Sequence, residues 1–181
     1  MKFNILILLS ITLFFSCKSP EARKPISVKT GSFIKKSAER NKELNIKEYE
    51  HIQNVIINKS DKEYIASNSG FWYTYIKKSD TLTYTPQFGD IVNYDYNIKT
   101  LEGEILYSKE ELRTQNYSID QQELFMGLRE GLKLLKSGES VTFVFPSQIA
   151  FGYYGDENKI GTNIPIICDV TVNNITINTN K

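Results

Sequence analysis

One stretch constrains the fold more than any other: residues 123–152, with the sequence ELFMGLREGLKLLKSGESVTFVFPSQIAFG. Gly127 and Gly131 stand inside an apolar helical pattern, where each glycine costs about 1 kcal/mol relative to alanine. We therefore expect another backbone or a ligand to approach this helix too closely for a side chain. After a turn, residues 141–145 alternate apolar and polar side chains, as a half-buried strand does. Phe151 and Gly152 then open a loop.

The start of the chain has the pattern of a secretory signal. Lys2 precedes an almost unbroken apolar run over residues 3–15, which is followed by Ser16 and Cys17. A charged start, an apolar run and a small-residue end are typical of a cleaved signal. The run is shorter than the roughly 20 apolar residues of a membrane-spanning helix, so a cleaved signal over residues 1–17 is favoured.

Composition excludes several classes of function. The formal net charge is +1, and basic and acidic residues are interspersed, so no face suited to nucleic acid stands out. The single histidine, His51, has no cluster of ligands around it, which predicts no metal site. Because His51 lies before the main domain, a Ser-His-Asp triad in that domain would lack the histidine that acts as its base. Cys168 lies in an apolar run over residues 164–170, which predicts a buried, inert thiol.

The chain divides into four predicted segments. Residues 18–43 follow the signal and are rich in basic residues, which predicts a flexible tether with a weaker helical stretch over 33–42. Apolar residues recur at helical spacing over 44–57, within a helical extension assigned to 44–69. We expect that helix to pack on the domain or to form a homodimer. Residues 70–181 form the main domain.

The main domain is predicted to be α+β. Its strands and single helix fit a curved, mainly antiparallel sheet that wraps one short helix. The predicted helix covers residues 124–135. The predicted strands cover residues 71–76, 91–98, 105–107, 117–119, 141–145 and 166–175.

Motifs in the second half of the chain resemble those of the FKBP family of peptidyl-prolyl isomerases. The family pattern G-W/L-x-x-G-L, a strand and then P-x-x-x-A-Y-G fits from Gly127 to Gly152 without a gap. Residues 88–96 and 101–108 are similar to its G-D-x-V-x-x-x-Y and D-G-x-x-F-D-S elements, and residues 160–172 to its final loop and strand. The resemblance implies an FKBP-like fold with an N-terminal helical extension.

The resemblance also implies a slot that binds proline, without any cofactor. The side chains that it assigns to catalysis are those of Tyr96, Leu106, Tyr107, Phe125 and Phe151. The side chains that it assigns to substrate binding are those of Tyr117, Leu124, Leu128, Ile160 and Cys168. The slot departs from the family in three ways. Phe151 lacks a hydroxyl that would donate to a substrate carbonyl, and Tyr107 replaces an aspartate. Leu128 and Cys168 stand where the family has aromatic side chains, which reduces the aromatic lining.

Such a slot would act by removing water from the X-Pro bond. Water solvates the planar amide better than the twisted form through which rotation passes, so a dry pocket lowers the barrier. The resemblance therefore implies an isomerase acting on proline-containing polypeptide clients. A non-catalytic chaperone or peptide-binding module of the same fold is the alternative, and a structural envelope lipoprotein of another fold is a third.

The residues before Cys17 resemble a bacterial lipobox, which implies acylation of this cysteine. The chain would then be held to a membrane of the bacterial cell envelope by a lipid anchor, facing the periplasm. As a whole it resembles the FKBP-type lipoproteins associated with gliding motility. The alternative is a plain secretory signal in which Cys17 has no special role.

Overall fold

The computed structural model describes residues 30–58 and 62–179. The chain separates into two compact units, Met1–Glu39 and Arg40–Lys181, and the contacts discussed below all lie within the second. The predicted signal over residues 1–17, with Cys17, lies outside the described residues.

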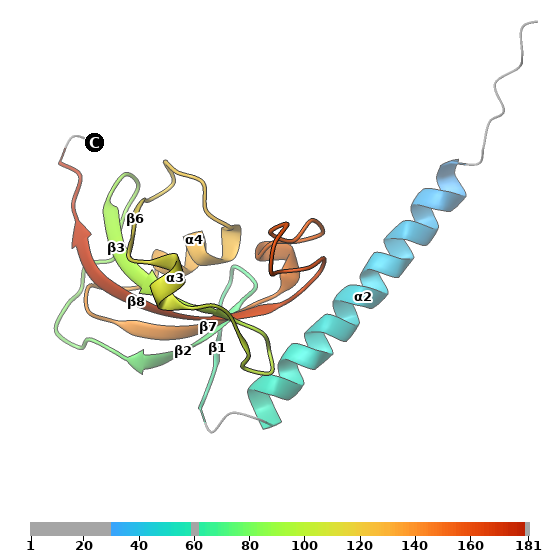
Figure 1. The fold of residues 1–181 in the computed structure, drawn as a ribbon, viewed down its shortest axis with the longest axis horizontal. Coiled ribbons are helices and arrows are strands. Elements are labelled where there is room, and N and C mark those ends of the chain that lie inside the picture. Colours follow the sequence, from blue (N-terminus) through green and yellow to red (C-terminus); the bar gives the residue numbers. More distant parts are fainter. Residues whose placement is uncertain (1–29, 59–61, 180–181) are drawn as a thin grey trace, which may run out of the picture. The chain divides into compact units, whose positions relative to one another are not determined.

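The second unit is built on one curved antiparallel sheet, with α4 on its concave side (Figure 1). The strands follow the order β1-β2-β7-β8-β3-β6, while β4 pairs with β5 and β8. This is the predicted plan of a sheet wrapped around one short helix. The strands are β1 (Ile65–Ala66), β2 (Trp72–Lys77), β3 (Ile91–Tyr96), β4 (Ile98–Lys99), β5 (Ile105–Tyr107), β6 (Gln115–Ser118), β7 (Ser140–Phe145) and β8 (Ile166–Thr176). The helices are α2 (Thr30–Asn58), α3 (Lys109–Leu112), α4 (Met126–Leu132) and the 3-10 turn η2 (Ser147–Ile149).

Two local features differ from the prediction. No helix was predicted between the strands over 105–107 and 117–119, but this stretch contains α3, because the side chain of Ser108 accepts a hydrogen bond from the Glu111 N–H at 3.3 Å. Ser and Glu three residues apart are a known helix start. The single strand predicted over 91–98 is divided into β3 and β4 at Asn97, whose N–H donates to the Asp169 carbonyl.

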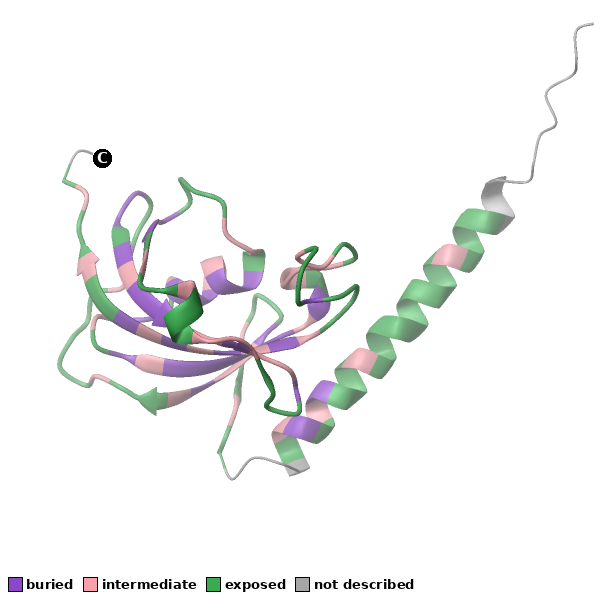
Figure 2. Ribbon diagram, viewed as in Figure 1, coloured by how far each residue is buried: buried purple, intermediate pink, exposed green. Residues whose placement is uncertain are grey.

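The helix of the N-terminal extension is α2 (Thr30–Asn58). The extension was predicted over residues 44–69, but Ile65–Ala66 within this range form β1, which pairs with β2 of the sheet. Helix α2 begins inside the range expected to be a tether, because residues 35–43 consist mainly of strong helix formers such as Lys, Glu, Arg and Ala. Most of α2 is exposed, and burial is confined to its C-terminal part (Figure 2). There Ile52 and Val55 are buried in a small cluster with Leu101 and Val144. The C-terminal end of α2 thus packs on the main domain, here called the body. This was one of the two expectations for the helix, the other being a homodimer.

The two helix glycines explain how α4 fits against the sheet. A Cβ at Gly127 would lie 2.5 Å from Cδ1 of Phe145, and one at Gly131 would lie 2.9 Å from Cζ of Phe143. The predicted close approach is therefore real, but its partner is neither a backbone nor a ligand. Two stacked core rings, with centroids 5.2 Å apart, occupy the space of the absent side chains.

Candidate functional site

The structure brings all ten predicted site residues of the domain to one hydrophobic cluster, in two layers. Four are buried and form a floor: Tyr117, Leu128, Ile160 and Cys168. Six are partly exposed and pack on that floor: Tyr96, Leu106, Tyr107, Leu124, Phe125 and Phe151. Since Leu128 and Cys168 are 0% exposed, a bound peptide would meet the second group and not the first.

Tyr96 stands at the end of β3 on the same face as Tyr94. Alternate residues of a strand point to one face, and the two rings lie 5.4 Å apart. Tyr94 is buried, whereas Tyr96 is only half-buried. Burial, together with the nearby Cys168, raises the pKa of Tyr96 to about 12. Its hydroxyl is therefore neutral throughout the physiological range, which suits a dry site.

Phe125 and Phe151 form an aromatic pair from two separate elements. Phe125 is the N-cap of α4 in an extended conformation, and Phe151 follows η2. Their ring centroids are 5.1 Å apart, and Phe125 also meets the buried Phe145 edge-on at 5.4 Å. The pair therefore rests on the core while remaining partly open to solvent.

Tyr107 has its hydroxyl occupied by the protein. The hydroxyl donates to Oδ2 of Asp156 and accepts from Nδ2 of Asn158 at 3.0 Å. Nζ of Lys159 lies 4.6 Å from the centroid of its ring. A hydroxyl has one proton to donate, so Tyr107 in this state cannot donate to a substrate carbonyl. Its role here is to hold the loop that follows Gly152.

Asp156 is the centre of that loop. Its Oδ1 accepts the N–H groups of Ile160 at 2.7 Å and Asn158 at 3.0 Å. Burial opposes ionisation of Asp156, but the hydrogen bonds from Tyr107 and these N–H groups outweigh it and lower the pKa of the carboxyl group. The loop, defined here as residues 147–163 and called the wall loop, is thus organised around a charge.

Sequence reasoning missed Asp156 and the residues around it. Asp, Asn and Gly in this loop indicate a turn in which the Asp side chain accepts a nearby N–H. The hydrogen bond between Asp156 and the Asn158 N–H could therefore have been predicted from the sequence. The contact with Tyr107 could not, because 49 positions separate the two residues. A second long-range contact also escaped: Nζ of Lys159 lies 2.6 Å from Oε1 of Glu111 on α3.

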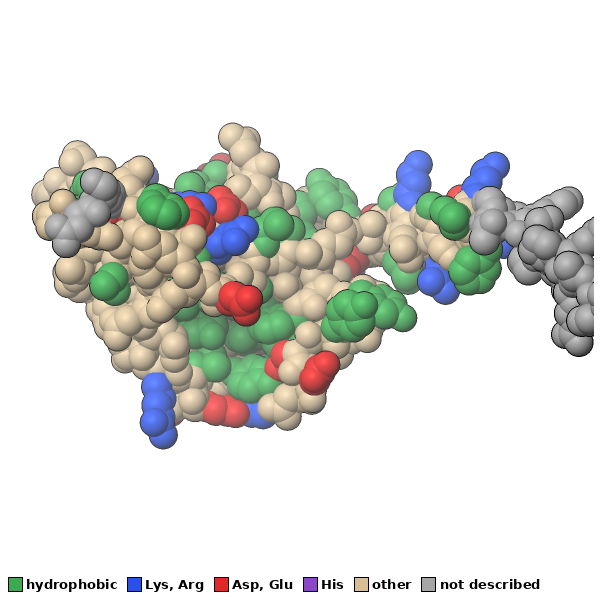
Figure 3. Space-filling model, turned by 90° about the horizontal axis from the view of Figure 1, so that it is seen from above, with side chains coloured by type: hydrophobic (Ala, Val, Ile, Leu, Met, Phe, Trp, Pro, Cys, Tyr) green, Lys and Arg blue, Asp and Glu red, His purple; other side chains and the backbone are tan. Residues whose placement is uncertain are grey.

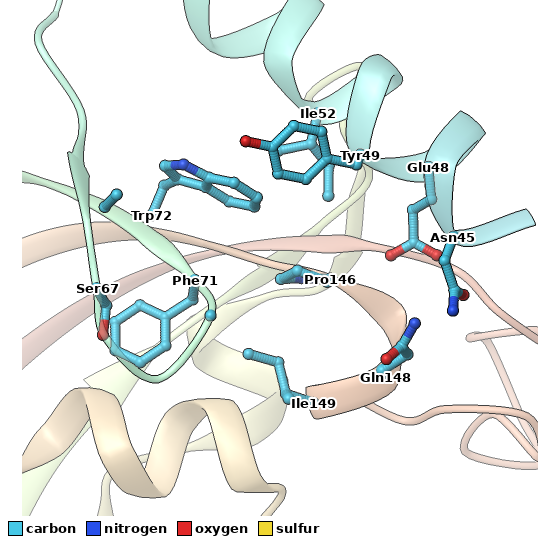
Figure 4. A pocket seen from close by; sticks show the side chains of 12 residues that line it. Asn45, Glu48, Tyr49, Ile52, Ser67, Phe71, Trp72, Pro146, Gln148 and Ile149 are labelled. Atoms are coloured by element: carbon cyan, nitrogen blue, oxygen red, sulfur yellow. The ribbon is translucent and has the colours of Figure 1, made fainter. Parts of the chain in front are cut away.

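The surface around the body contains several hollows. Figure 3 shows one with a hydrophobic floor and acidic side chains at its rim. A separate cavity of about 420 Å³ lies between α2 and the body, with Tyr49, Trp72 and Phe71 on one side and Asn45 and Gln148 on another (Figure 4). None of the ten predicted site residues lines this cavity or any of four other cavities among the described residues.

The described residues contain no group of three or more His, Cys, Asp or Glu side chains placed to hold a metal ion. His51 is exposed on α2, with Nε2 3.4 Å from Oε1 of Glu102. Cys168 is buried, and burial raises the pKa of its thiol. Over residues 30–58 and 62–179, every helix is too short or too polar to cross a membrane.

Comparison with known proteins gives a family match. The model of the FKBP-type peptidyl-prolyl cis-trans isomerase family matches residues 82–173, just over half of the 181 residues. The chain is also 28% identical over 102 residues to a probable FKBP-type peptidyl-prolyl cis-trans isomerase FkpA from Neisseria meningitidis serogroup B. That match takes in 56% of this chain and 36% of the relative, so the chain spans about a third of the relative's length.

Solved structures show the same fold. A peptidyl-prolyl cis-trans isomerase from Pseudomonas syringae matches with a TM-score of 0.61 and 16% identity, over 75% of this chain and 96% of that one. FkpA from Escherichia coli matches with a TM-score of 0.60 and 20% identity, over 96% and 82%. The N-terminal domain of FKBP42 from Arabidopsis thaliana gives 0.57 and 16%, over 65% and 95%. The predicted FKBP-like α+β fold with an N-terminal helical extension is confirmed.

Proposed function

The chain belongs to the FKBP-type peptidyl-prolyl cis-trans isomerase family, and on that premise we propose that it accelerates rotation of X-Pro bonds in polypeptide clients. The observation that carries the proposal is the partly exposed group of Tyr96, Phe125 and Phe151 above a buried apolar floor. These rings offer an apolar surface on which a prolyl ring can be held away from water.

Catalysis would come from exclusion of water. The amide has an isomerisation barrier of about 18 to 20 kcal/mol, and its planar form is better solvated than the twisted form. A site that favours the twisted form by about 4 kcal/mol would speed rotation roughly a thousandfold. No residue has to ionise, which agrees with a Tyr96 hydroxyl whose pKa is raised to about 12.

The site has fewer free hydroxyl groups for a substrate carbonyl than the family pattern provides. Phe151 has no hydroxyl, and the hydroxyl of Tyr107 is already bonded to Asp156 and Asn158. One hydrogen bond typically contributes about 0.5 to 1.5 kcal/mol, so turnover would be slower than with a donor in place. We therefore propose an isomerase of modest rate whose contribution comes mainly from its apolar surface.

A protease-coupled assay with a set of X-Pro peptides tests the proposal, using protein that lacks residues 1–17. We expect acceleration by the parent protein, and a loss of more than tenfold in kcat/KM for Tyr96→Ala and for Phe125→Ala with the fold retained. Phe88→Ala is the matched control, since Phe88 is an exposed phenylalanine before β3. Equal activity in all variants would show that the site lies elsewhere.

The second candidate is a chaperone or peptide-binding module without useful turnover. The observation that favours it is an exposed aromatic pair on the wall loop, Tyr153 and Tyr154, which are 68% and 82% exposed with ring centroids 5.4 Å apart. Such rings can contact unfolded clients. Suppression of aggregation of an unfolded client, without acceleration of any X-Pro peptide, would favour this candidate.

We also propose that the protein works at the bacterial cell envelope, facing the periplasm, with a lipid on Cys17 as its membrane anchor. The signal pattern of residues 1–17 supports this. Cys17→Ser should move the protein from the membrane fraction to the soluble one, and unchanged partitioning would contradict lipidation. A role in gliding motility rests on the sequence resemblance, and loss of surface movement on gene deletion, restored by the parent gene, tests it.

Formation of a homodimer through α2 is a further part of the proposal. Phe33 and Ile34 are 72% and 66% exposed on the first part of this helix. Apolar residues on a helix face are stabilised by burial against a partner. Phe33→Glu should convert a dimer to a monomer in sedimentation analysis, and a monomeric parent protein would contradict the proposal.

A further inference from the structure

A carboxylate of the N-terminal helix reaches the base of the wall loop. Oε1 of Glu48 accepts the N–H of Ser147 at 2.6 Å, and Oε2 accepts the Ser147 hydroxyl at 2.6 Å. Ser147 is 2% exposed, and Glu48 is half-buried. Hydrogen bonds to a charged acceptor are stronger than those between neutral groups, and here one carboxylate makes two to the same residue.

Ser147 passes this constraint on to the loop. Its carbonyl accepts the N–H of Ala150 at 3.1 Å and that of Gly152 at 2.8 Å, so the two bonds enclose the backbone that leads to Phe151. The carbonyl of Gly152 in turn accepts the N–H of Asn163 at 2.9 Å, which closes the far end of the loop. The backbone on both sides of Phe151 is thus linked to Glu48 through Ser147.

Other packing between α2 and the body is sparse at this point. Glu48 lines three separate cavities of about 420, 290 and 420 Å³. Figure 4 shows its carboxylate beside one of them, with Pro146 and Ile149 of the body nearby. The apolar contacts of α2 lie further along the helix, where Tyr49 meets Trp72 at 5.4 Å and Ile52 and Val55 are buried. Those residues hold the helix, whereas Glu48 contacts the loop.

We propose that Glu48 is a positioning residue for the prolyl-binding site, acting through Ser147 on the loop that carries Phe151. The proposal rests on the proposed function for its effect on turnover. Glu48 lies outside residues 82–173, to which the family match extends. The functional unit of this chain therefore includes the end of α2, and a domain cut at the family boundary would have a looser wall.

Amide hydrogen exchange of the full chain gives the direct test. Exchange reports local opening, so the amides of Gly152 and Asn163 report whether the wall loop is held. We expect Glu48→Ala to speed exchange at these two amides at least tenfold, while amides of β7 and β8 stay unchanged. Glu50→Ala is the matched control, since Glu50 is an exposed glutamate on the same helix.

Two further variants separate positioning from simple loss of the helix. Glu48→Gln keeps one carbonyl oxygen as an acceptor, and Ser147→Ala keeps the N–H but removes the hydroxyl, so each should give a smaller effect. The double variant of Glu48→Gln and Ser147→Ala should speed exchange at Gly152 and Asn163 no more than Glu48→Ala does, because both changes act on one contact. Trp72 is the single tryptophan of the chain, and its emission reports whether α2 remains packed beside it.

In the peptide assay, we expect Glu48→Ala to lower kcat/KM about three- to tenfold, mainly through a higher KM, with Trp72 emission unchanged. Unchanged exchange at Gly152 and Asn163 overturns the proposal. So does a shift of Trp72 emission in Glu48→Gln, which would mean that Glu48 only holds the helix. If the parent protein has no isomerase activity, the proposed function fails, and the exchange result still decides whether Glu48 positions the loop.

Discussion

The floor of the candidate site and its wall loop are built by different forces. The floor is apolar: its residue Leu128 lies on α4, which Gly127 and Gly131 allow to pack against the rings of Phe145 and Phe143. The wall loop is held by hydrogen bonds of polar side chains and backbone groups. It is fixed at its tip by the contact between Asp156 and Tyr107 and at its base by the contact between Ser147 and Glu48.

The difference teaches where the protein can vary its function. A packed floor responds to volume, since interiors are as dense as organic crystals and a misplaced methyl group disturbs many neighbours. A loop held by a few hydrogen bonds responds to the loss of a single atom. Changes in the floor should therefore alter stability, whereas changes in the wall should alter the way a peptide binds.

The largest expected effect is on the floor. Gly127→Ala should lower the free energy of unfolding by about 1 to 3 kcal/mol, as overpacking does, because the new Cβ would lie 2.5 Å from the Phe145 ring. Urea denaturation measures it. The loss should outweigh the roughly 1 kcal/mol that alanine gains over glycine in a helix.

Two controls decide whether packing is the cause. Gly161→Ala should change stability by less than about 0.5 kcal/mol, since its Cβ would meet nothing closer than 3.7 Å. Phe145→Leu combined with Gly127→Ala should be more stable than the sum of the two single losses predicts. Equal stability of the Gly127→Ala and Gly161→Ala variants would break the contrast between floor and wall.

The next effect concerns the tip of the wall loop. Tyr107→Phe and Asp156→Asn should each lower the free energy of unfolding by about 0.5 to 1.5 kcal/mol and raise KM for an X-Pro peptide. The two changes share the hydrogen bond between Tyr107 and Asp156, so the double variant should lose less than the sum of the two single losses. Glu157→Gln, at an exposed neighbour, is the control. Fully additive losses would show that the contact does not hold the loop.

A smaller effect should come from restoring a donor on the wall. Phe151→Tyr adds a hydroxyl beside the Phe125 ring, and a hydrogen bond to a substrate carbonyl should raise kcat/KM about two- to tenfold. Phe88→Tyr, at an exposed site before β3, should leave activity unchanged. A Phe151→Tyr variant no faster than the parent would mean that the wall contributes no polar contact to turnover.

The smallest effect is a dependence on alkaline pH. Burial raises the pKa of Tyr96 to about 12 from an ordinary value near 10. The neutral phenol is favoured in the folded protein, so its contribution to stability is complete below about pH 10 and is lost as pH rises through 12. Burial also raises the pKa of Tyr94, so phenolate absorbance should show one fewer late-titrating tyrosine in Tyr96→Phe than in the parent protein. Titration of Tyr96 near pH 10 would place its ring outside the dry part of the site.

Local sequence patterns gave a correct account of most of the fold. Residues 105–107 are a strand as predicted. The strand predicted over 141–145 begins one residue earlier, at Ser140, and residues 141–145 are all buried, whereas a half-buried strand was expected. The helix predicted over 124–135 is shorter, Met126–Leu132, because Phe125 has an extended backbone and caps it. The short helix α3 was missed although Ser108 and Glu111 carried its signature.

The division of the site into floor and wall was not predictable. Tyr117, Leu128, Ile160 and Cys168 were expected to touch a peptide, and the structure places them below the surface. Spacing of residues along a strand or helix fixes which face a side chain occupies, but not what covers it. The depth of a residue depends on neighbours that come from other elements.

The sequence by itself determined the sheet, the helix across it and the close approach at Gly127 and Gly131, because alternation and helical spacing act between residues a few positions apart. The tertiary structure alone decided how the wall loop is anchored. The contacts at its tip and at its base join residues that are 49 and 99 positions apart. A hydrogen bond tolerates a change of only a few tenths of an ångström in the distance between donor and acceptor. The whole fold must first bring these two atoms together.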